Sequence, residues 1–122
     1  MEVARIRSIL DRHGARFLSR IAGAEEGRLA GFTGVGLAEH VSGLFAAKEA
    51  VLKALGTGAA HGLTFRDVII LSALGGRPQV RLVGAAERLA STLGVGHVHL
   101  SITHERGHAA AVAILERSGR AR

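Results

Sequence analysis

The chain has 122 residues, of which 48% are hydrophobic and 21% are charged, so it fits one globular domain and its composition excludes a disordered protein. It has no cysteine and therefore no disulfide or thiolate chemistry, and no apolar run approaches the roughly 20 residues of a membrane span. The formal net charge of +6 predicts a partner among phosphates, nucleic acids and acidic proteins, and charge alone does not choose among them. Nucleic acid is the weakest of these, because the arginines are spread along the chain and no groove-reading motif occurs, and we expect a cytoplasmic protein without membrane or nucleic-acid partners.

Two helices are predicted in the first half of the chain. Apolar residues recur at helical spacing over residues 2–12, and Gly14 is expected to interrupt or end this helix. The strongest helical pattern covers residues 37–55 and ends in the turn sequence Gly56, Thr57, Gly58.

The second half reads mainly as strands. Strands are predicted at 67–74, 79–83, 97–103 and 108–115, with a helix at 85–93 and a flexible tail at 116–122. The sequence therefore predicts a single α+β domain over residues 1–122, in which an antiparallel sheet packs against a long central helix.

Glu49 and Lys53 lie four residues apart on the predicted central helix and share one of its faces. A carboxylate beside an ammonium suits magnesium–phosphate chemistry, because magnesium prefers oxygen ligands and lysine can offset phosphate charge. The alternative is a solvated ion pair, which is the commoner fate of residues at this spacing.

Four histidines lie within residues 97–108, and two of them, His97 and His99, share one strand face. Their separation from His104 and His108 matches no compact zinc signature, so a zinc site is not expected. His104, at a strand end, either donates to a phosphate or is a turn residue.

The first helix is rich in arginine. Its face is either solvated or a docking surface for an acidic helix, because arginine pairs well with carboxylates. The residues concerned are Arg5, Arg7, Arg12, Arg16 and Arg20.

Four segments occur in an order that resembles the bacterial holo-acyl-carrier-protein synthases. They read FAAKEAVLKALGTG, GLTFRDVIIL, GRPQVRLVGAA and HVHLSITHE, and the resemblance extends from about Glu2 to Leu115. The most specific part of this resemblance is a helix with the pattern KE-xxx-K that ends in GTG and is followed later in the chain by SITHE.

The resemblance implies a phosphopantetheinyl transferase, which moves the 4′-phosphopantetheine arm of coenzyme A to a serine of an acyl carrier protein with the help of magnesium. It implies a homotrimer with sites between subunits. Glu49 would be the metal ligand and, with Lys53, catalytic; His104, Lys48 and the loop of Gly56, Thr57 and Gly58 would contact the coenzyme. The basic helix, through Arg5, Arg12 and Arg16, would dock the acidic carrier.

Two features depart from this family. Its members usually open with a strand like GIGTDIVEI, whose Asp is a second metal ligand, and Met1 falls about where the Val of that strand would be. Leu44 stands where the family usually has Arg. We expect either a longer, active natural product or a catalytically impaired relative that only binds the carrier, with an exposed sheet edge in this chain.

Overall fold

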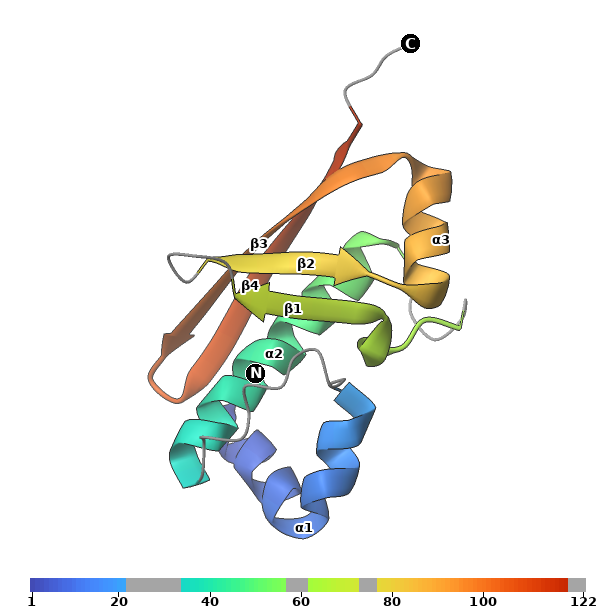
Figure 1. Cartoon of the computed structure of the whole chain (residues 1–122). Helices are drawn as coiled ribbons and strands as arrows, with labels where there is room; N and C mark the ends of the chain where they lie inside the picture. The colour runs from blue at the N-terminus through green and yellow to red at the C-terminus, as the bar shows by residue number, and fades with distance from the viewer. Residues whose placement is uncertain (22–33, 57–61, 73–76, 119–122) are drawn as a thin grey trace.

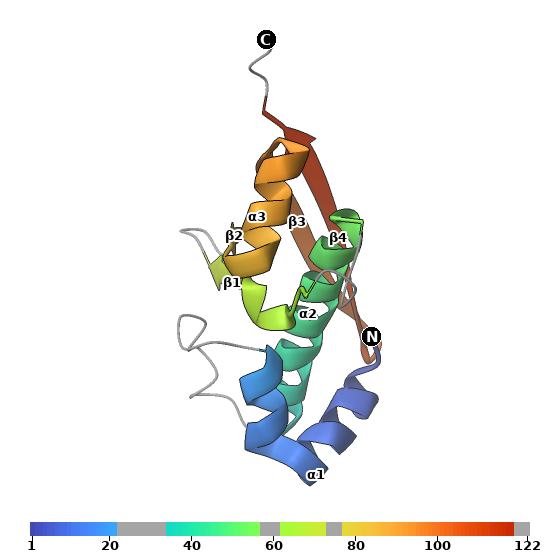
Figure 2. The ribbon, with the colours of Figure 1, turned by 90° about the vertical axis from the view of Figure 1, so that its right-hand side faces the viewer.

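The computed structural model describes residues 1–21, 34–56, 62–72 and 77–118. α1 and α3 lie at opposite ends of the molecule and α2 runs between them (Figure 1, Figure 2). This α+β architecture confirms the predicted fold class. In chain order the elements are α1 (Val3–Ile21), α2 (Gly34–Ala54), the short 3₁₀ helix η4 (Phe65–Asp67), β1 (Val68–Ser72), β2 (Pro78–Leu82), α3 (Gly84–Leu93), β3 (Val95–Glu105) and β4 (His108–Arg117).

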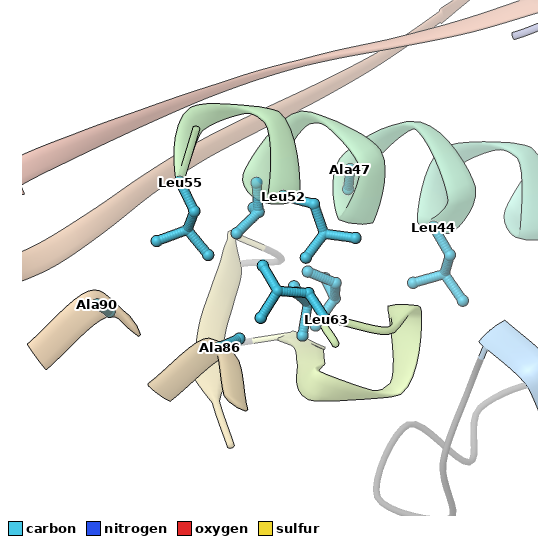
Figure 3. Packing of buried hydrophobic residues seen from close by; sticks show 10 residues of the cluster. Leu44, Ala47, Leu52, Leu55, Leu63, Ala86 and Ala90 are labelled. Carbon is cyan, nitrogen blue, oxygen red and sulfur yellow. The ribbon is translucent and has the colours of Figure 1, made fainter. Parts of the chain in front are cut away.

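The long helix α2 is the centre of the main hydrophobic core. One side of it packs against β1, β3 and β4, because its apolar residues recur about every turn on that side. Figure 3 shows another part of this core, where side chains of α2 lie beside Leu63, in the segment before β1, and beside Ala86 and Ala90 of α3. The buried α2 residues of this core are Leu44, Ala47, Val51, Leu52 and Leu55, the last just beyond the helix.

The strands form two separate antiparallel hairpins rather than the one sheet that the sequence predicted. β1 pairs with β2, with Ile70 opposite Val80, and β3 pairs with β4, with Ser101 opposite Val112. β2 and β3 contact each other without forming a hydrogen-bonded ladder, and α3 connects them. Gly84, at φ +57°, makes the turn into α3.

The start of the chain pairs with the start of β4. The Met1 amino group donates to the carbonyl oxygen of Ala109 at 2.6 Å, and the Ala109 amide donates back to Met1 at 2.7 Å. Glu2 forms an isolated antiparallel bridge with His108. These bonds cover one end of the β4 edge that we expected to be exposed.

α1 is bent at Gly14, where the backbone leaves the helical range (φ 16°, ψ −102°). The helix resumes and ends at Ile21, so Gly14 interrupts α1 without ending it. After the bend, the Phe17 ring stacks on Phe45 of α2 with centroids 6.4 Å apart, and Phe45 in turn contacts Phe65 at 5.0 Å. These ring contacts hold α1 against α2 and η4.

The first residues of the predicted C-terminal tail are part of a strand. Glu116 and Arg117 belong to β4, where they pair with His97 and Val95 of β3. The Ser118 amide also donates to the Gly94 carbonyl at 2.9 Å. The sequence pattern missed these residues because cross-strand bonds, rather than buried side chains, order them. Residues 119–122 lie outside the described part.

Candidate active site

Glu49 and Lys53 lie one turn apart near the C-terminal end of α2, as the sequence predicted. The Glu49 side chain is half-buried and that of Lys53 is exposed. Within the described part of the chain, neither joins an ion pair or a side-chain hydrogen bond. The solvated ion pair, which was the alternative interpretation, is therefore not formed, and no described residue pairs with either charge.

The chain turns immediately after this pair. Leu55 donates its amide to Val51, and the Gly56 amide donates to Lys53, so the helix closes in a tight turn. Gly56 has φ +88°, a left-handed conformation that glycine adopts without strain. Thr57 and Gly58, which were predicted with it to line a coenzyme pocket, lie outside the described residues.

His104, near the C-terminal end of β3, lies against the N-terminal half of α2. Its ring Nε2 is 2.9 Å from the carbonyl oxygen of Glu39. The ring passes so close to Gly43 that a Cβ placed there would be 3.0 Å from two ring atoms. Gly43 and Glu49 are separated by about 9 Å along the helix and about 120° around it. One chain therefore brings His104 and Glu49 to the same helix but to different faces of it.

Lys48, which was predicted to contact the coenzyme, is fully buried in this chain. Its Nζ donates to the carbonyl oxygens of Phe65 at 3.0 Å and Val68 at 2.7 Å. These contacts join α2 to η4 and β1. The sequence carried a sign of this structural role, since Lys48 follows Leu44 by one turn on the apolar side of the helix. A coenzyme contact of Lys48 stays a prediction.

Leu44, where the resembling family usually has Arg, is part of the hydrophobic core with 6% of its surface exposed. The chain therefore presents no guanidinium at this position. An apolar side chain packed among Ala47 and Leu63 contributes to stability instead (Figure 3).

The predicted docking arginines are all exposed on α1. Arg5 and Arg12 precede the bend at Gly14, and Arg16 follows it. None of them joins an ion pair within the described residues. Both limbs of α1 therefore carry exposed positive charge, and a docking role for it stays a prediction.

A cavity of about 830 Å³ lies away from Glu49 and His104, between β2, α3 and the start of β3. Its polar lining includes Arg77, Gln79, Ser91 and His97. Sequence reasoning did not single out this cavity, because it depends on how β2, α3 and β3 pack in space rather than on a motif in any one of them.

The histidine-rich strand builds no metal centre within the described residues, where no group of three or more potential ligands converges. His97 and His99 share a strand face as predicted, with ring centroids 4.3 Å apart. His99 Nε2 is 3.0 Å from a carboxylate oxygen of Glu116. The hydrogen bond from His99 and its nearby charge lower the pKa of the Glu116 carboxyl.

Sequence and structure comparisons place the chain among known proteins. Residues 1–113 match the model of the 4′-phosphopantetheinyl transferase superfamily. The holo-[acyl-carrier-protein] synthase of Vibrio parahaemolyticus is 44% identical over 116 residues, covering 94% of this chain and 90% of that protein.

Solved structures of holo-acyl-carrier-protein synthases have the same fold as this chain. The Helicobacter pylori holo-[acyl-carrier-protein] synthase in complex with coenzyme A superposes with a TM-score of 0.81 and 28% identity, over 95% of each chain. The Bacillus anthracis holo-(acyl-carrier-protein) synthase in complex with CoA (3′,5′-ADP) gives 0.78 and 34%, over 97% of this chain and 91% of that one.

The fold and the match over most of its length define this chain as a phosphopantetheinyl transferase. Its curated relatives identify one family within this superfamily. The chain belongs to the holo-[acyl-carrier-protein] synthase family.

Proposed function

We propose that this chain transfers the 4′-phosphopantetheine group of coenzyme A to a serine of an apo-acyl-carrier protein. The relatives named above support the reaction class, and two of their structures hold coenzyme A or its nucleotide portion. The observation that carries the proposal is the pair of Glu49 and Lys53, which lie one turn apart on α2 and form no ion pair with any described residue.

The chemistry follows from the two charges. The serine Oγ forms a bond to the phosphorus next to the pantetheine arm, and the bond from that phosphorus to the bridging oxygen breaks. Adenosine 3′,5′-bisphosphate leaves with the bridging oxygen and its negative charge. Glu49 accepts the serine proton through a water molecule, and the Lys53 ammonium offsets charge on the phosphoryl oxygens.

The family implies a magnesium ion, and the residues can be tested for their fit. Glu49 offers one carboxylate, and the described part of the chain holds no group of three or more potential ligands. Magnesium in phosphoryl-transfer sites is commonly held by one or two carboxylates together with substrate phosphates and water. Glu49 therefore fits a magnesium ion that arrives with the coenzyme, where the ion would offset charge on the diphosphate.

We propose that the working enzyme is a homotrimer with sites between subunits. Val112 and Ile114, on the outer face of β4, are 61% and 59% exposed. Two adjacent apolar side chains on an open sheet face favour contact with another copy. Sites between copies would also explain why His104 and Glu49 lie on different faces of α2 in one chain, since each copy would supply one of them.

The carrier protein is the expected acidic partner, and Arg5, Arg12 and Arg16 are its proposed docking residues. Their exposed guanidinium groups would guide a negatively charged helix and fix its orientation. The reaction takes place in the cytoplasm under this proposal. Among the described residues, no helix has both the length and the apolar character needed to cross a membrane.

A second candidate is a relative that binds the carrier without modifying it. It is favoured by the described residues, which hold no group of three or more potential metal ligands. Incubation with coenzyme A, magnesium and apo-carrier separates the two candidates. An enzyme adds one phosphopantetheine mass to the carrier, whereas a binding protein gives arginine-dependent carrier binding with no mass gain. The second result would overturn the proposed reaction.

A further inference from the structure

The imidazole of His104 occupies a place on α2 that exists because residue 43 has no side chain. A Cβ at Gly43 would lie 3.0 Å from both Cε1 and Nε2 of His104 and 3.4 Å from a methyl carbon of Ile102. Contacts of 3.0 Å are closer than carbon atoms normally pack, so any larger residue would force the ring to move.

Because Gly43 has no side chain, the His104 ring can also reach a backbone carbonyl of α2. In an α-helix the amide of residue 43 donates to the carbonyl of Glu39, one turn earlier. The His104 Nε2 reaches this same carbonyl oxygen at 2.9 Å. The Glu39 carbonyl oxygen can accept from both the residue 43 amide and His104 only if residue 43 has no Cβ, because a Cβ would occupy the position of the ring.

This hydrogen bond determines which ring nitrogen carries the proton. A carbonyl oxygen only accepts, so Nε2 must be the protonated nitrogen. In the neutral ring Nδ1 is then the unprotonated nitrogen, and it makes no hydrogen bond within the described part of the chain. In histidine, the hydrogen bond made by one ring nitrogen commonly determines whether the other nitrogen carries a proton.

We propose that Gly43 is a positioning residue, which together with the Glu39 carbonyl holds His104 in the Nε2–H form and offers Nδ1 to the coenzyme. The part that concerns the coenzyme rests on the proposed function. The neutral ring is then an acceptor toward the ligand and becomes a donor through Nδ1 only when it is protonated. This assigns a task to Gly43 that its sequence context alone does not indicate.

The first test uses the free protein labelled with ¹⁵N. Long-range proton–nitrogen correlations at alkaline pH distinguish the two neutral forms of a histidine ring, and His104→Gln identifies the signals of His104 by removing them. The proposal expects one dominant Nε2–H pattern in the parent protein and loss of that pattern in Gly43→Ala. A mixed or Nδ1–H pattern in the parent, or an unchanged pattern in Gly43→Ala, would overturn it.

The second test compares thermal unfolding in two backgrounds. Alanine is a much better helix former than glycine, so Gly43→Ala should raise the melting temperature wherever nothing opposes it. The proposal expects Gly43→Ala to lower the melting temperature when His104 is present and to raise it in the His104→Ala background. A rise of equal size in both backgrounds would contradict the contact.

The third test adds coenzyme A to the labelled protein. The His104 Nδ1 signal should shift as the coenzyme binds, while Gly43→Ala should weaken binding several-fold. Coenzyme binding that leaves the Nδ1 signal unchanged would overturn the role of this nitrogen. No coenzyme binding at all would count against the proposed function, and the first two tests would still decide whether Gly43 positions the ring.

Discussion

The ammonium of Lys48, on α2, donates a 2.7 Å hydrogen bond to the carbonyl oxygen of Val68, at the start of β1. The same Nζ also reaches the carbonyl of Phe65 at 3.0 Å, inside a fully buried setting. A buried charge is stable only when its partners replace water, and here the partners are backbone groups of the turn that leads into the β1–β2 hairpin. Lys48 therefore fixes where this hairpin begins relative to the central helix.

We predict that Lys48→Met lowers the free energy of unfolding by about 2–4 kcal/mol, because two buried carbonyls lose their donor. Urea unfolding followed by circular dichroism measures this loss. Lys53→Met on the exposed side of the same helix is the matched control and should change stability by less than about 0.5 kcal/mol. Equal effects of the two variants would show that the Lys48 contacts contribute little.

The turn between β3 and β4 places a strained residue beside a glycine. Arg106 has φ +51° and Gly107 has φ +78°, the pair of left-handed conformations typical of a two-residue hairpin turn. Arg106→Asn should raise stability by about 0.5–1 kcal/mol, since Asn tolerates this conformation better than Arg. Chemical denaturation measures this gain in stability. Arg117→Asn, at the end of β4, is the control and should not raise stability.

Self-association through the outer face of β4 should be sensitive to charge there. Ile114→Lys or Val112→Lys should convert the oligomer to monomer, because an ammonium would have to be buried in an apolar contact. Sedimentation velocity gives the oligomeric state directly. Leu93, which is 39% exposed at the end of α3, supplies the control: Leu93→Lys should leave assembly intact. If the parent protein sediments as a monomer, the proposed trimer is wrong.

The pair of His99 and Glu116 should respond to acid in one direction. The His99 hydrogen bond and charge lower the pKa of the Glu116 carboxyl from its ordinary value of 4.5, so the folded state binds this proton less readily than the unfolded chain. The contribution of the pair is therefore present above pH 4.5 and is lost as pH falls through the lowered pKa.

Carboxyl-carbon NMR of Glu116 tests this shift. His99→Gln should raise the pKa of Glu116 toward its ordinary value, whereas His97→Gln should change it much less, because His97 contributes only a weaker electrostatic effect. An unchanged Glu116 titration in His99→Gln would mean that the cross-strand bond is not maintained in solution.

Local sequence pattern predicted the elements well because most of them bury one face. The periodic apolar residues of α2 and the alternation along β2 and β3 are direct consequences of that burial. Glu49 and Lys53 were placed correctly on one face of α2 because helical spacing alone determines which residues share a face.

The features that sequence missed depend on contacts between distant segments. Lys48 was expected to contact the coenzyme, and its backbone acceptors were not foreseen because they lie 17 and 20 residues further along the chain. Gly43 gave no local signal, since its importance comes from a ring 61 positions away in sequence. The division into two hairpins depends on whether β2 and β3 share hydrogen bonds, which strand patterns do not encode.

The proposed reaction depends on the charges of Glu49 and Lys53, and intact-mass spectrometry of the apo-carrier after incubation with coenzyme A and magnesium tests them most directly. The account predicts that the parent chain adds one phosphopantetheine per carrier. It predicts that Glu49→Gln and Lys53→Ala slow this at least about 100-fold with little change in stability, since neither side chain has an ion-pair or hydrogen-bond partner among the described residues. Carrier modified equally fast by Glu49→Gln and by the parent chain would contradict it.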